Sequence, residues 1–157
     1  MKSETLTMLS EASLSKIQDL IRINIDAAKG FDEAASNVDV QSVSAMFRQL
    51  ASERTANANE LKRFVELNNA EAVESGSILG AIHRAWIDLR SAVNGGDAYV
   101  ILCEAEKGED SIKKSYEEAL AEMSGSAIHS VIAQQFVGIK RGHDRVRDLR
   151  DEFAEDK

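Results

Sequence analysis

The sequence of 157 residues contains no proline and a single cysteine, and aromatic residues make up only 5% of it. Turn-rich β proteins rarely lack proline entirely, so this absence favours an all-helical chain. The single cysteine, Cys103, excludes an internal disulfide. No apolar run is long enough to span a bilayer, and no apolar leader opens the sequence. We therefore expect a cytoplasmic protein that does not associate with membranes.

The charge balance is acidic, with Lys+Arg 19 against Asp+Glu 27 and a formal net charge of -8. An acidic domain repels the phosphate backbone of nucleic acids, so we expect no nucleic-acid partner. The length suits one domain over residues 1–157 with a sizeable buried core.

Apolar residues recur at helical spacing in five segments, which predict long helices over 14–38, 40–67, 97–123 and 127–153 and a shorter amphipathic helix over 78–93. Ser15 with Gln18 predicts a capping box, and Asp39 and Asp97 are the expected N-caps of the helices that follow them. The first two helices are joined by a very short link, so they must be antiparallel neighbours.

The shorter helix lies in a long connection between the second and third long helices. A crossover of this length makes those two helices run parallel, which is the ferritin-like connectivity. The sequence therefore predicts an all-α, ferritin-like four-helix bundle. It consists of two antiparallel helical hairpins, with an extra short amphipathic helix in the crossover.

The metal ligands of ferritin-like proteins are missing. Their di-metal sites need Glu-x-x-His pairs, but the residues three positions before His83, His129 and His143 are Gly, Ser and Lys. We therefore expect a degenerate metal site with no cofactor. The alternative is an atypical iron or manganese site built from carboxylates and a histidine that flank the apolar stripes, namely Glu104, Glu109 and His143.

Polar residues interrupt the apolar stripes instead. Asn24, Arg54 and Gln135 lie on the stripes, and Glu109 flanks one. A buried guanidinium requires a carboxylate and further acceptors. We predict a core polar network at one level of the bundle, with an Arg54–Glu109 pair whose remaining hydrogen bonds go to Asn24 and Gln135. Alternatively, Arg54 extends past the edge of the core with only its stem buried.

Gly108, Gly138 and Gly142 lie inside the last two predicted helices, where glycine is unfavourable. They indicate close approach of helices or, alternatively, a small-molecule cavity beside Gly108 and Gly138. Trp86 on the short helix is expected to anchor that helix to the core.

Several motifs resemble a bacterial family of unknown function whose members are described as ferritin-like four-helix-bundle proteins. The resemblance covers about residues 14–151 and is carried by GAIHRAWIDLR at 80–90, GGD at 95–97, CEAEKGED at 103–110, YEEAL at 116–120 and HDRVR at 143–147. It implies the bundle fold and no established activity or cofactor, so no catalytic residue is assigned.

Together these features favour a non-enzymatic protein that acts by association with itself or with a protein partner. A homodimer is the expected assembly, since two-fold dimers are the commonest oligomers. The alternatives are a di-metal oxidase or metal store and a small-molecule binder.

Overall fold

The computed structural model describes residues 9–68, 70–73 and 80–155, without the side chains of residues 80–83 and 155. Its five helices are α2 (Glu11–Asn37), α3 (Gln41–Leu67), α4 (Gly80–Gly95), α5 (Ala98–Glu122) and α6 (Ile128–Glu155). The described residues contain no strand, which confirms the all-helical prediction. The predicted start of the short helix, at residues 78 and 79, lies outside them.

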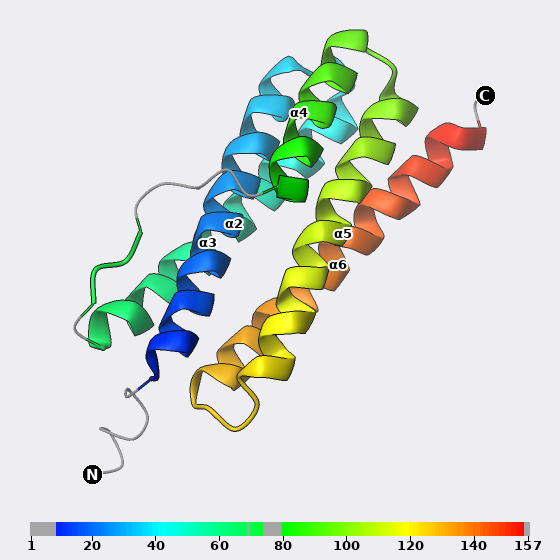
Figure 1. Ribbon diagram of the computed structural model, residues 1–157. Helices are drawn as coiled ribbons and strands as arrows, with labels where there is room; N and C mark the ends of the chain where they lie inside the picture. The colour runs from blue at the N-terminus through cyan, green and yellow to red at the C-terminus, as the bar shows by residue number, and fades with distance from the viewer. Residues whose placement is uncertain (1–8, 69, 74–79, 156–157) are drawn as a thin grey trace.

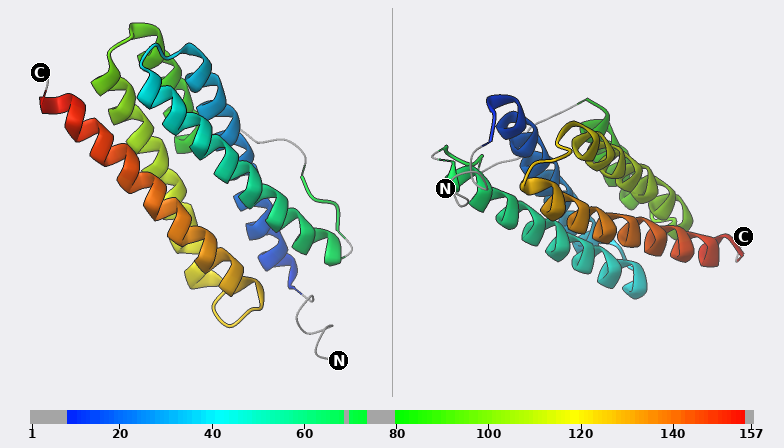
Figure 2. Two further views of the ribbon diagram at one scale, coloured as in Figure 1. Left: turned by 180° about the vertical axis from the view of Figure 1, so that it is seen from behind. Right: turned by 90° about the horizontal axis from the view of Figure 1, so that it is seen from below.

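The helices form a bundle in which α2 packs against α3 and α5 packs against α6, each pair being antiparallel (Figures 1 and 2). α3 and α5 run in the same direction, and α4 lies against α2 and α5 at the end of the bundle where α2 turns into α3. Apolar side chains face inward. None of the helices in the described part of the chain is long and apolar enough to cross a membrane.

The first helix begins three residues earlier than predicted, so the capping box at Ser15 is wrong. The N-cap is Ser10, whose hydroxyl accepts a hydrogen bond from the Ser13 N–H at 3.1 Å. Gln18 has another role, because its carboxamide donates to the Glu71 carbonyl and accepts from the Val73 N–H. These bonds attach the segment after α3 to the first turns of α2.

One of the two aspartates predicted as N-caps is a cap in the structure, and the other is not. Asp39 is not a cap, since α3 begins after Val40 without a side-chain cap. Asp97 caps α5 as predicted, accepting from the Tyr99 N–H at 2.9 Å and the Val100 N–H at 3.4 Å. Gly96, with a φ of +79°, supplies the left-handed residue between α4 and this cap.

Trp86 attaches α4 to the rest of the bundle. Its ring packs edge-on against Phe31 of α2, with ring centroids 5.0 Å apart. Two glycines make room for the indole: a Cβ at Gly30 would lie 2.8 Å from Trp86 Cε3, and one at Gly108 would lie 3.4 Å from Cη2. Close approach therefore explains Gly108, whereas the same prediction is wrong for Gly138, where a Cβ would meet nothing within 4 Å.

Gly30→Ala and Gly138→Ala form a matched test of this packing. Gly30→Ala is expected to lower the free energy of unfolding by about 1–3 kcal/mol, because the new methyl group displaces the Trp86 ring. Gly138→Ala is expected to raise it by about 1 kcal/mol, because alanine is the better helix former and meets no neighbour. Urea unfolding measures both, and equal effects of the two substitutions would contradict the account of Trp86.

Candidate functional site in the bundle core

The centre of the bundle contains a buried ion pair. Arg54 is the middle residue of α3, and Glu109 lies one residue from the middle of α5. Arg54 Nη2 donates to Glu109 Oε2 at 2.6 Å, and the two side chains are only 1% and 0% exposed. Arg54 therefore does not extend past the edge of the core. α3 and α5 pack mainly on other helices and lie diagonally across the bundle (Figure 2). Because Arg54 is on α3 and Glu109 is on α5, the pair spans this diagonal.

Gly142, in the middle of α6, lies level with this pair. A Cβ at Gly142 would be 2.9 Å from Arg54 Nη2, 3.0 Å from Glu109 Oε2 and 2.9 Å from Leu50 Cδ2. The ion pair therefore packs against bare helix backbone. This contact gives Gly142 a specific role that compensates for the low helix propensity of glycine.

Burial and ion pairing have opposite effects on the pKa of Glu109. Burial raises the pKa of the Glu109 carboxyl above its ordinary value, and the charge and hydrogen bond of Arg54 oppose that rise. Two atoms of the pair, Arg54 Nε and Glu109 Oε1, are buried without a hydrogen-bond partner. Each charged group thus depends strongly on the other, because the surroundings offer little else to satisfy it.

A second cluster of buried polar side chains lies between the ion pair and the end of the bundle where α5 turns into α6. The Tyr116 hydroxyl donates to Gln135 Oε1 at 2.7 Å and accepts from Asn24 Nδ2 at 2.8 Å. Gln135 Nε2 donates in turn to Glu60 Oε1 at 2.8 Å, and Asn57 Nδ2 donates to Asn24 Oδ1 at 3.4 Å. This Tyr116 network links all four long helices.

The predicted Arg54–Glu109 pair is therefore confirmed, but the prediction that Asn24 and Gln135 complete its hydrogen bonds is wrong. Asn24 and Gln135 bond to Tyr116 and not to the ion pair, which lies about two helical turns away along α5. The reason is the antiparallel register of α5 and α6, which places Gly142 level with Glu109 and Gln135 level with Tyr116. Tyr116 was missed although it lies on the apolar stripe of α5, where a buried hydroxyl needs partners.

The alternative metal ligands are not brought together. Glu109 is paired with Arg54, Glu104 contacts Lys107 Nζ at 3.2 Å, and His143 Nε2 lies 2.8 Å from Asp110 Oδ1. Among the residues that the structure describes, no group of three or more His, Cys, Asp or Glu side chains is arranged to hold a metal ion. The guanidinium of Arg54 would also repel a divalent cation at Glu109, so these residues do not fit a di-metal site.

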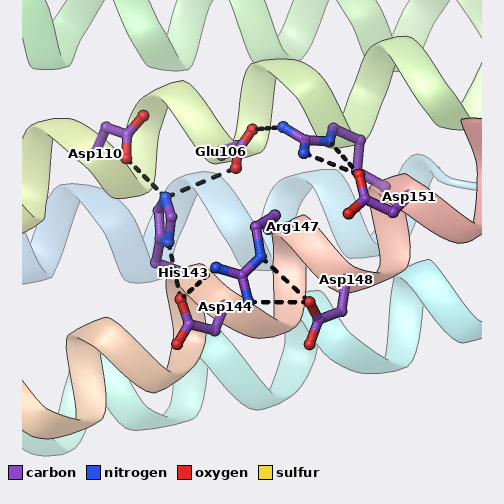
Figure 3. A network of polar contacts seen from close by, with 8 residues as sticks. Glu106, Asp110, His143, Asp144, Arg147, Asp148 and Asp151 are labelled. Carbon is purple, nitrogen blue, oxygen red and sulfur yellow. Dashed lines mark hydrogen bonds and ion pairs between the residues drawn. The ribbon is translucent and has the colours of Figure 1, made fainter.

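His143 belongs to a charged seam between α5 and α6 (Figure 3). Its Nε2 faces Asp110 and, at 3.7 Å, Glu106 Oε2, while its Nδ1 lies 3.3 Å from Asp144 Oδ1. Arg150 extends the seam by pairing with Glu106. Acidic side chains of α5 thus meet basic side chains of α6 along the outer side of this hairpin.

The surroundings of Gly108 and Gly138 do not match the predicted cavity beside both glycines. The Trp86 ring covers Gly108, and Gly138 faces open space. A pocket of about 240 Å³ lies instead between α2 and α4, where Gly30 and Trp86 line it. Gly30 was not among the glycines singled out from the sequence, since its role depends on where α4 docks.

Removing one partner of the central ion pair is expected to lower the free energy of unfolding far more than removing both partners. Arg54→Met leaves a buried carboxylate unpaired and should lower the free energy of unfolding by about 3–5 kcal/mol. The double variant Arg54→Met with Glu109→Met should recover most of that loss, because it leaves no buried charge. Denaturant unfolding of the single and double variants tests this, and additive losses would show that the two charges do not depend on each other.

The Tyr116 network predicts a loss of stability at alkaline pH. Burial raises the pKa of Tyr116 above its ordinary value of 10.0. Above that pH the unfolded chain releases the phenolic proton while the folded chain keeps it. Stability therefore falls as the pH rises.

Tyr116→Phe should be less stable near neutral pH but show a smaller decrease above pH 10.0, as measured by urea unfolding across the pH range. Phenolate absorbance supplies the second measurement. If Tyr116 ionises near its ordinary pKa while circular dichroism still reports the native fold, the account of its burial is wrong.

Comparison with curated proteins finds no match to this chain. The model of one protein family, described as Domain of unknown function (DUF2383), matches residues 12–122. This range runs from the first turn of α2 to the end of α5, and it includes Arg54, Trp86 and Glu109 but not Gly142. The expected membership of a family of unknown function is therefore confirmed. Because the match spans more than half of the sequence, the chain belongs to the DUF2383 family.

Proposed function

We propose that this protein is a ferritin-like four-helix bundle of the bacterial cytoplasm that has no enzymatic activity and acts by association. The observation that carries this proposal is the Arg54–Glu109 pair at the middle of the bundle. Ferritin-like chemistry takes place at inward-facing carboxylates at this position. In this protein the guanidinium of Arg54 compensates the charge of that carboxylate. The interior residues therefore stabilise the fold, and we assign the function to the surface.

The helix arrangement supports the ferritin-like assignment. Two antiparallel hairpins, α2–α3 and α5–α6, are connected so that α3 and α5 run in the same direction. Such a connection needs a crossover along the bundle, and α4 lies within it.

The surface of α4 is the proposed interface. Ala85, Leu89 and Val93 are buried on its inner side, while Ile87 is 46% exposed. An exposed large apolar side chain on a helix that covers the bundle is suited to contact with a second copy. A homodimer with two-fold symmetry would bring two such helices together.

Light scattering after size-exclusion chromatography tests the proposed association. We expect a dimer that Ile87→Asp converts to a monomer, because burial of a carboxylate in an apolar interface is unfavourable. Val137→Asp is the matched control, since Val137 is 53% exposed but lies on α6. A monomeric parent protein would contradict self-association, and a dimer broken only by Val137→Asp would place the interface elsewhere.

Elemental analysis of protein purified without chelator tests the absence of metal chemistry. We expect substoichiometric iron and manganese in the parent protein and in Glu109→Gln alike. Stoichiometric metal that is lost on replacing Glu109, with the helical content retained, would favour a di-metal oxidase or metal store and contradict the proposal.

A further inference from the structure

The pocket between α2 and α4 combines an apolar floor with charges of both signs. Ala34 from α2 and Trp86, Leu89 and Val93 from α4 supply the apolar lining. Glu33 and Arg90 line the same pocket, with Arg90 Nε 3.1 Å from Glu33 Oε1. The volume is about 240 Å³. Small-molecule sites typically have this composition, with apolar walls and a few polar groups that orient the ligand.

The Glu33–Arg90 pair is available to a ligand. The two side chains are 45% and 64% exposed, and an ion pair this exposed contributes little to stability. Replacing this ion pair by contacts with a ligand therefore costs little free energy. Asn37 and Asn94 also line the pocket, and carboxamides can form further hydrogen bonds; the Asn37 carboxamide already donates one to the Glu33 backbone carbonyl.

We propose that this pocket binds a free α-amino acid with an apolar side chain. The ligand's ammonium group pairs with the Glu33 carboxylate and its carboxylate with the Arg90 guanidinium, while its side chain contacts the Trp86 face of the pocket. A ligand with one charge would satisfy one of these residues and be repelled by the other. The size is suitable, since a cavity of ~150 Å³ already admits benzene.

Trp86 provides a direct signal for binding, because it is the only tryptophan of the chain and lines the pocket. The full chain is titrated with L-phenylalanine and L-leucine while the indole emission is recorded. A saturable change at millimolar concentration is expected for at least one of them. Phenethylamine, which lacks the carboxylate, and 3-phenylpropionate, which lacks the ammonium group, are expected to bind at least about tenfold more weakly than L-phenylalanine.

Charge-removing variants connect the signal to the pocket. Glu33→Gln and Arg90→Gln are each expected to weaken amino-acid binding about tenfold or more. Arg84→Gln is the matched control, since Arg84 is an exposed arginine on α4 that does not line the pocket, and it should bind normally. The proposal is overturned if neither amino acid produces a saturable change in the Trp86 emission. It is also overturned if the singly charged analogues bind as tightly as L-phenylalanine, or if the Glu33 and Arg90 variants bind as tightly as the parent protein. None of these binding measurements depends on the oligomeric mass of the protein. They therefore test amino-acid binding independently of the proposed self-association.

Discussion

The Arg54–Glu109 ion pair is the interaction on which the rest of the core depends. It crosses the diagonal of the bundle from the middle of α3 to the middle of α5, and both side chains are removed from water. The cost of that desolvation is offset only if the two groups stay within hydrogen-bond distance. The pair therefore restricts how far α3 and α5 can shift or rotate. It also requires α6 to approach closely, which Gly142 permits.

Polar groups in a helical core give it a defined register, which apolar contacts alone specify weakly. About two turns along α5 from the ion pair, the Tyr116 hydroxyl bonds to Asn24 and Gln135 and so connects α2, α5 and α6. Two polar layers at different heights restrict sliding of the helices more strongly than one layer would. At the α4 end, packing acts in place of hydrogen bonds, since Trp86 fills the space left by Gly30 and Gly108.

The sequence predicted the helices and the Arg54–Glu109 pair, but not that Asn24 and Gln135 bond to Tyr116. Apolar residues at helical spacing and the Asp97 cap are local signals, and the structure shows helices in each of the five predicted segments. Arg54 lies on an apolar stripe and Glu109 flanks one, and charged residues at such positions need partners. Gly142 and Tyr116 escaped notice as members of these groups, since a missing side chain and an aromatic ring on an apolar stripe carry no polar pattern.

The sequence by itself determined the helical class, the five helices and the absence of every Glu-x-x-His pair, because each follows from residue type and short-range spacing. Only the tertiary structure decided that Gly142 meets the ion pair, that Gln135 meets Tyr116, and that Glu33 and Arg90 border one pocket. These contacts join residues from different helices. Their positions depend on how side chains of neighbouring helices interdigitate, and a shift of one turn between helices would change each of them.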